Sequence, residues 1–178
     1  MPRNIRISLK DATAERIAKG ATAFVIPIEP QPSYTWDINA WGWSIKFIPE
    51  IEPFCQPGEP LYLMETWARV RISGGFDYYY KADDSKLFRT VLRWHSPATM
   101  PNIACRHIWT AGKIEAVRVK RLTVKQARNI ILEKSCDIGH YFRGHYFRDW
   151  FAETYPHLNM DSWVWYIEKG EDNGTDTL

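Results

Sequence analysis

Alternating apolar and polar residues mark several short strands along the chain. Residues 5–9 alternate Ile and Leu with Arg and Ser, residues 43–47 alternate Trp, Ile and Phe with Ser and Lys, and residues 162–168 alternate two tryptophans and an isoleucine with Val and Tyr. Because successive side chains of a strand point to opposite faces, each pattern predicts a strand. Proline is frequent between residues 27 and 60, so the rest of that region is expected to be mostly loop.

The longest alternating run, residues 61–70, follows a proline-rich turn and is predicted to form one strand. The residues that would share one of its faces are Leu61, Leu63, Glu65 and Trp67. A Ser-Gly-Gly sequence at 73–75 then predicts a hairpin, with the aromatic run from Phe76 as its second strand. The carboxylate on an otherwise apolar face requires a partner.

A further strand is predicted over residues 113–122, with valines facing inward and basic residues facing outward. Its alternation slips by one position between Ala116 and Val117, which predicts a β-bulge there. The outward-facing basic residues are Arg118 and Lys120.

Two helices are predicted from their start and stop signals. The first covers residues 12–19, is started by Asp11 and ends at Gly20. The second follows Thr123, which is expected to form a capping box with Gln126. The residues that this second helix would turn inward are Val124, Ala127, Ile130 and Ile131.

A third helix is predicted around residues 145–155, before a proline. Five or six short strands with three helices among them predict an α+β domain, built on a small, strongly curved sheet or β-barrel with flanking helices. The 178 residues suit one domain, which we assign to residues 1–169. Residues 170–178 are predicted to be an acidic, disordered tail.

Composition and motifs exclude several function classes. The chain is 45% hydrophobic and 25% charged with a net charge of +2, which is typical of a globular domain and too little charge to hold nucleic acid by bulk attraction alone. We find no apolar run long enough to span a membrane and no secretory signal. Three widely spaced cysteines predict neither a disulfide framework nor a zinc site, and the absence of phosphate-loop and dinucleotide motifs predicts no cofactor.

Charge is distributed unevenly along the chain. Residues 26–66 contain one basic and six acidic residues, whereas residues 113–148 contain nine basic and three acidic ones. One interpretation is that these are solvated faces of a neutral domain. The other is a bipolar surface whose basic side contacts phosphates.

Four segments, taken in order, resemble ASCH-domain proteins of the PUA-like superfamily, of the type common in bacteriophages and prophages. They are PGEPLYLMETWARV, YYYKADD, WHSPATMPNIACRH followed by VRVKRLTVKQAR, and DSWVWYIE. The first is similar to the family's P-G-D-x-L-W-V-R-E-T-W and the last to its N-P-W-V-W-V-I-E-F. Together the segments span roughly residues 12 to 168.

The resemblance implies a small β-barrel with flanking helices and a cleft that holds RNA or a modified nucleobase. It also implies a hydrolase in one branch, which acts on N4-acylated cytidine with a Lys and a Thr in G-x-K-x-x-T and a Glu elsewhere. The matching stretch here, residues 17–30, lacks that pair in either register. The hydrolytic set is therefore interpreted as eroded, and the polar groups that remain as catalytic candidates are Lys19, Thr22 and Glu65.

Glu65 lies in the first matching segment, and Arg106 matches an arginine of the family. We expect these two residues to pair. The pair is either structural, or Glu65 is a cleft carboxylate that recognises an amino group of a base while Trp67 or Trp94 stacks on its ring.

The leading hypothesis is a non-enzymatic, phage-derived PUA-like module in the cytoplasm of a bacterial host, which binds RNA or another nucleic acid near Trp67, Trp94 and Arg106. The basic groups expected to contact phosphates are Arg118, Lys120, Arg121, Lys125 and Arg128. One alternative is a hydrolase of N4-acylated cytidine or of RNA. Another is a protein-binding inhibitor or decoy of a host defence factor.

Overall fold

We describe the protein from a computed structural model. The ranges that the structure describes are residues 4–31, 35–39, 42–46, 53–83, 91, 93–132 and 140–170. The predicted acidic tail falls outside these ranges except for Gly170, and Cys136 also lies outside them.

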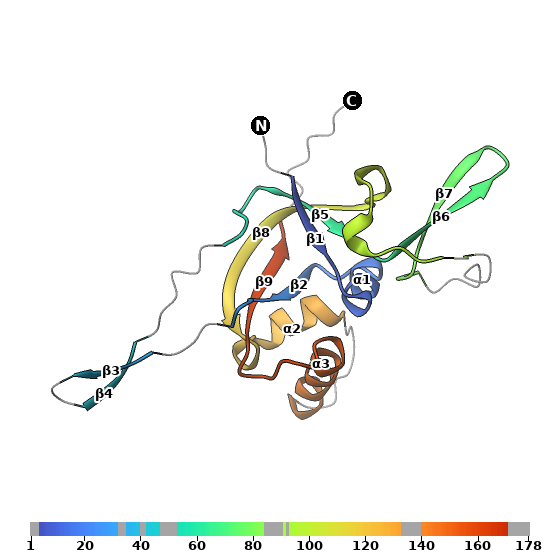
Figure 1. The fold of residues 1–178 in the computed structure, drawn as a ribbon. Helices are drawn as coiled ribbons and strands as arrows, with labels where there is room; N and C mark the ends of the chain where they lie inside the picture. The colour runs from blue at the N-terminus through green and yellow to red at the C-terminus, as the bar shows by residue number, and fades with distance from the viewer. Residues whose placement is uncertain are drawn as a thin grey trace.

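A mixed α+β fold is built on one curved five-stranded sheet. Its strands, in spatial order, are β1 (Ile5–Ser8), β5 (Pro60–Met64), β8 (His107–Arg118), β9 (Trp163–Lys169) and β2 (Ala23–Pro27). Strands β1 and β5 are parallel, and the other neighbours are antiparallel. The long β8 sweeps around the body and joins the two halves of the sheet (Figure 1). Within the described residues β1 and β2 remain unpaired edges, so the sheet does not close into a barrel.

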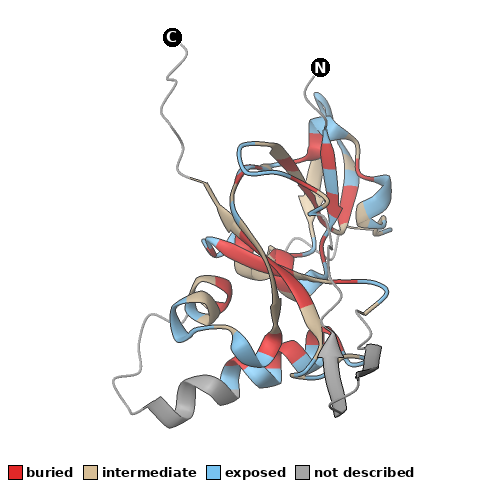
Figure 2. Ribbon diagram, turned by 90° about the vertical axis from the view of Figure 1, so that its left-hand side faces the viewer, coloured by how far each residue is buried: buried red, intermediate tan, exposed pale blue. Residues whose placement is uncertain are grey.

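Strands β2 and β9 are buried on both faces, whereas β1 and the first part of β8 alternate buried and exposed residues. The concave side packs around Phe24, Leu61 and Trp165, together with helix α1 (Asp11–Ala18). The other side packs Tyr166 and neighbouring residues against helices α2 (Val124–Ile131) and α3 (His140–Thr154). Figure 2 shows buried residues along the strands and on the helix faces turned towards them.

Two hairpins extend from this body (Figure 1). The first pairs β3 (Thr35–Asn39) with β4 (Gly42–Lys46), and the second pairs β6 (Trp67–Ile72) with β7 (Gly75–Tyr80). Short 3-10 turns complete the described elements: η2 (Pro97–Thr99), η3 (Asn102–Ala104) and η4 (Val119–Arg121).

Several predicted elements are confirmed. Helix α1 is present, and Gly20, with a φ of +101°, follows its end as predicted; its start differs, because Asp11 is the first helical residue and Lys10, with no side-chain cap hydrogen bond, takes the N-cap position. The Thr123 hydroxyl accepts a hydrogen bond from the Gln126 backbone N–H and the Gln126 side chain accepts one from the Thr123 backbone N–H, so the capping box is present. The Ser-Gly-Gly hairpin is also present as β6 and β7.

Other predictions are wrong. The run 61–70 is two strands, because β5 ends at Met64 and β6 begins at Trp67 with new pairing partners. The register shift in β8 lies between Ala111 and Ile114 rather than at residues 116 and 117. A Cβ on the intervening Gly112 would come within 2.8 Å of the Gly170 backbone, so this glycine permits the close approach of β8 and the end of β9.

The interior of α2 also differs from its prediction. Val124 is 49% exposed instead of facing inward. It is the first residue of α2, whereas the buried residues Ile130 and Ile131 lie in the last turn of the helix. Strand β8 stops at Arg118, and the next three residues form the turn η4.

Candidate functional site

Glu65 and Arg106 form the predicted pair at the junction of β5 and β8. Glu65 follows the last residue of β5 and is 0% exposed, whereas Arg106 immediately precedes β8. Arg106 Nε and Nη2 donate to the two carboxylate oxygens of Glu65 at 2.8 and 2.9 Å. Its Nη1 donates to Asp83, and its guanidinium lies 4.1 Å from the centre of the Tyr80 ring. The pair therefore ties the end of β5 to the start of β8.

The electrostatics of this cluster favour the structural interpretation of the pair. Burial raises the pKa of Glu65, against the opposing effect of the Arg106 hydrogen bonds and charge. Burial, together with the positive charge of Arg106, lowers the pKa of His107. Two carboxylates, Glu65 and Asp83, compensate one guanidinium, so Arg106 offers no net positive charge to a phosphate. Because Glu65 is buried and both its oxygens are bonded, recognition of a base by its carboxylate is not supported.

Trp67 is also less accessible than predicted. It is 8% exposed and packs with Met64, Met100 and Cys105 in a small core. Its ring stacks on His95 with centroids 4.8 Å apart, and the two backbones exchange hydrogen bonds. Trp94, beside His95, is partly buried. Trp67 is thus covered by other residues and does not itself present an exposed ring.

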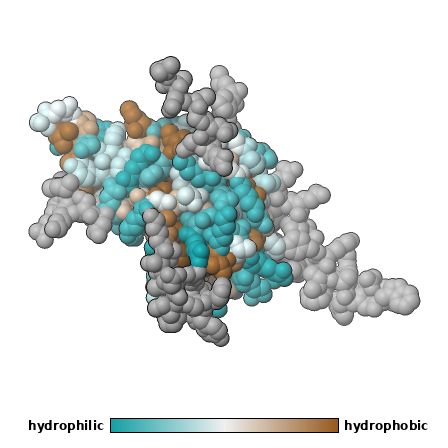
Figure 3. Space-filling view, turned by 180° about the vertical axis from the view of Figure 1, so that it is seen from behind, coloured by the Kyte–Doolittle hydropathy of each residue, from teal (hydrophilic) through white to brown (hydrophobic). Residues whose placement is uncertain are grey.

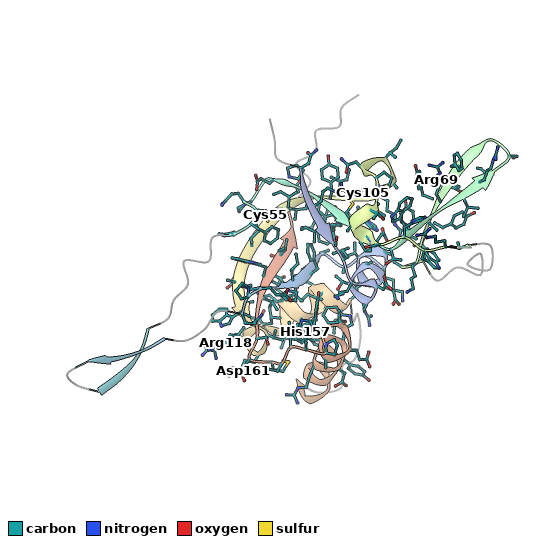
Figure 4. All side chains as sticks on the ribbon, viewed as in Figure 1. Cys55, Arg69, Cys105, Arg118, His157 and Asp161 are labelled. Atoms are coloured by element: carbon teal, nitrogen blue, oxygen red, sulfur yellow. The ribbon has the colours of Figure 1, made fainter. Side chains whose placement is uncertain are left out.

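The predicted phosphate-binding residues lie at the other end of β8. Strand β8 has twelve residues, so at about 3.3 Å per residue the contour from His107 to Arg118 is about 36 Å. Figure 4 places the labelled Arg118 and Asp161 far from Cys105 and Arg69. The structure therefore separates Arg106 and Trp67 from the basic residues that were predicted to share their cleft.

The residues of this basic group differ in whether they already pair with a carboxylate. Arg118 and Lys120 both pair with the exposed carboxylate of Asp161. The remaining three are exposed and have no carboxylate partner among the described residues: Arg121, Lys125 and Arg128. We call these three residues the α2 cluster.

The catalytic candidates are not brought together. Lys19 caps the end of α1 and pairs with Glu15 on the exposed face of that helix. Thr22 is exposed, and its backbone bonds to Asn129 and Lys169 at the far end of the sheet. Thr66, the neighbour of Glu65 in sequence, contacts Asp11 at the start of α1, whereas Lys19 follows the other end of that helix, about 12 Å further along its axis.

A different polar group at the start of α1 was not predicted. The Thr66 hydroxyl donates to Asp11 at 2.6 Å, and the Lys81 ammonium donates to the other oxygen of Asp11 at 2.7 Å. Partial burial raises the pKa of Asp11, but the hydrogen bonds from Lys81 and Thr66 outweigh it and lower the pKa below its ordinary value. A cavity of about 350 Å³ opens here, lined by Ser8, Leu9, Lys10, Asp11, Thr66 and Pro97. No sequence spacing signals this group, because its members come from three separate segments.

The β6–β7 hairpin is the second feature that the site predictions missed. Arginines alternate with apolar residues in β6, and aromatic residues fill β7. The Ser-Gly-Gly turn fixes the register between the two strands, so the sequence did contain the signal.

Among the described residues, no group of three or more His, Cys, Asp or Glu side chains is placed to hold a metal ion. None of the helices in the described part of the chain is long and apolar enough to cross a membrane. No protein-family model, curated protein or solved structure matches the chain.

Proposed function

We propose that the chain is a PUA-like, phage-derived module that binds nucleic acid and has lost the family's hydrolytic set. The observation that carries the proposal is the α2 cluster, three exposed cations without carboxylate partners in the part of the chain that the structure describes. Residues 116–132 contain five basic residues and no acidic one. Cations that are not neutralised within the protein are available to replace the counterions of a phosphate backbone.

The fold supports the PUA-like part of the proposal. Its sheet is small and strongly curved, with α2 and α3 on the outer face, as the resemblance implies. A cavity of about 240 Å³ lies between the two unpaired edges, lined by Ser8 at the end of β1, by Leu9 after it, and from β2 by Val25, Ile26 and Pro27. An incompletely closed barrel with a cleft at its seam would have this geometry.

The test is the salt dependence of binding to a labelled single-stranded oligonucleotide. In the triple variant Arg121→Ala/Lys125→Ala/Arg128→Ala, the log–log salt slope should become shallower by about 2, since each phosphate contact on a single strand contributes about 0.7. The control is Lys19→Ala/Lys113→Ala, which removes two lysines that already pair with Glu15 and Glu115. An unchanged slope in the triple variant would remove the α2 cluster from the interface.

The Thr66, Asp11 and Lys81 group favours a second candidate function, hydrolysis of an acyl compound in the adjacent cavity. The Thr66 hydroxyl would attack the acyl carbon while Asp11 accepts its proton; the acyl–nitrogen bond would break, the leaving amine would take up that proton, and water would then hydrolyse the acyl ester on Thr66. The lowered pKa of Asp11 makes it a weak base, so we place this function second. Turnover of N4-acylated cytidine that is abolished by Asp11→Asn and retained in Lys125→Ala would support it, and no turnover by the wild-type protein would reject it.

A further inference from the structure

One face of the β6–β7 hairpin alternates arginine with aromatic rings. The register pairs Trp67 with Tyr80, Arg69 with Tyr78, and Arg71 with Phe76. Directly paired residues share a face of a hairpin, as do residues two apart on one strand. All six side chains therefore lie on the same face, which we call the ladder face; its members are Trp67, Arg69, Arg71, Phe76, Tyr78 and Tyr80.

The side chains of the ladder face contact one another and continue into the body of the protein. The Arg69 guanidinium lies 3.6 Å from the centre of the Phe76 ring. Trp67 packs on Tyr78 with centroids 6.0 Å apart, and His95 also stacks on Trp67. At the inner end, Arg106 covers Tyr80. The stack is thus anchored by the buried Glu65–Arg106 pair.

Exposure increases from the inner end of the ladder face to its tip. Trp67 is buried at 8%, Tyr78 and Tyr80 are half-buried, and Phe76 is 53% exposed. Arg69 and Arg71 are exposed and have no carboxylate partner among the described residues. In Figure 3, the view from behind, the hairpin end of the molecule is pale and brown rather than continuously teal.

Hairpin stability accounts for only part of this arrangement. A two-stranded hairpin is marginally stable alone, and cross-strand aromatic and cation–π contacts stabilise it. Those contacts explain the inner rings, which are covered. The contact of Arg69 with Phe76 extends this stabilisation towards the tip, yet the Phe76 side chain stays 53% exposed, and neither Arg69 nor Arg71 has a carboxylate partner among the described residues.

We propose that the ladder face is a platform on which consecutive bases of a single-stranded nucleic acid stack, with Arg69 and Arg71 contacting its backbone. This inference rests on the proposed function and names the form of nucleic acid and the surface that binds it. Bases in a duplex already stack on each other, whereas a single strand can present its base faces to protein rings. The accessible rings, Phe76 and Tyr78, provide stacking positions for about two bases.

The decisive experiment compares two substitutions in the same strand. Phe76→Leu removes a ring from the ladder face, whereas Tyr79→Leu removes a ring from the opposite face, where Tyr79 pairs with Ala68. Both variants and the wild type are titrated, by fluorescence anisotropy, into labelled oligo-dT and oligo-U of about 12 nucleotides and into a duplex of the same length. Thermal melting of each variant checks that it is folded.

We expect Phe76→Leu to weaken single-strand binding about tenfold, with duplex binding changed by less than about twofold. Tyr79→Leu should leave both affinities unchanged. A second variant, Arg69→Lys, keeps the charge but loses the planar stacking group, and should weaken single-strand binding less than Arg69→Ala.

Equal losses in Phe76→Leu and Tyr79→Leu, or no loss in Phe76→Leu, would overturn the inference. An equal loss for duplex and single strand would overturn it as well, because stacking on bases would then not be the cause. If the α2 cluster variant alone weakens binding, the ladder inference fails while the proposed function stands. If the wild type binds none of the probes, both fail.

Discussion

The buried pair of Glu65 and Arg106 allows a quantitative test of how the two halves of the sheet are joined. Both carboxylate oxygens of Glu65, which is 0% exposed, accept hydrogen bonds from Arg106. Arg106→Met retains an apolar stem on Tyr80 but leaves a buried carboxylate without its partner, which costs about 3–5 kcal/mol. For a protein of this length each kcal/mol lowers Tm by about 2–4 °C, so we expect the variant to melt about 6–20 °C below the wild type.

Two matched variants separate this effect from general damage. Asp83→Asn removes the other carboxylate partner of Arg106. Because the Asp83 side chain is 42% exposed, this change should cost less than about 1 kcal/mol. Glu65→Met/Arg106→Met removes both charges and should recover much of the stability lost in the single variant, because no uncompensated charge stays buried.

The pH dependence of thermal stability provides a second, independent test of the pair. Burial already raises the pKa of Glu65, and loss of the Arg106 hydrogen bonds and charge would raise it further. A carboxyl whose folded pKa exceeds its unfolded value contributes stability below the unfolded value and loses it as pH rises through the folded pKa. The Tm gap between Arg106→Met and the wild type should therefore narrow from pH 8 towards pH 5 in scanning calorimetry. A gap of less than about 2 °C at both values would refute this reasoning.

Three further outcomes are expected. Thr123→Ala removes the capping box and should lower stability by about 1 kcal/mol in urea unfolding. Gly112→Ala should destabilise the folded protein by about 1–3 kcal/mol, because the added Cβ meets the Gly170 backbone. Gly74→Ala, with open space around it, should be nearly neutral, and equal Tm values for the two variants would contradict the close packing at Gly112. Burial raises the pKa of Cys55 to about 11, so iodoacetamide at pH 8 should label it far more slowly in the folded protein than in urea, as read by peptide mass spectrometry.

The sequence predicts local structure correctly where residues close together in the chain determine it. The capping box at Thr123 and the end of α1 at Gly20 depend on backbone groups within one helical turn. The pairing of Glu65 was expected because a carboxylate on an apolar strand face needs a partner, and its partner is the arginine that the resemblance indicated.

The errors arise where the choice of partner strand decides the structure. Alternation continues through Glu65 and Thr66, so periodicity could not show that β5 joins the main sheet while β6 leaves it to pair with β7. The same limit applies to the candidate site. Arg106 and Arg118 are twelve positions apart in sequence, and only the extended strand that joins them shows that they lie at opposite ends of β8.

The proposed binding of nucleic acid through exposed cations and aromatic rings is tested most directly by titrating the wild-type chain into a labelled single-stranded oligonucleotide at two salt concentrations. With contacts from the three residues of the α2 cluster and from Arg69 and Arg71, the affinity should fall by about 100-fold between about 50 and 200 mM salt. Saturable binding that weakens in this way is the predicted result. The absence of binding to DNA or RNA, single- or double-stranded, at the lower salt concentration would contradict the account.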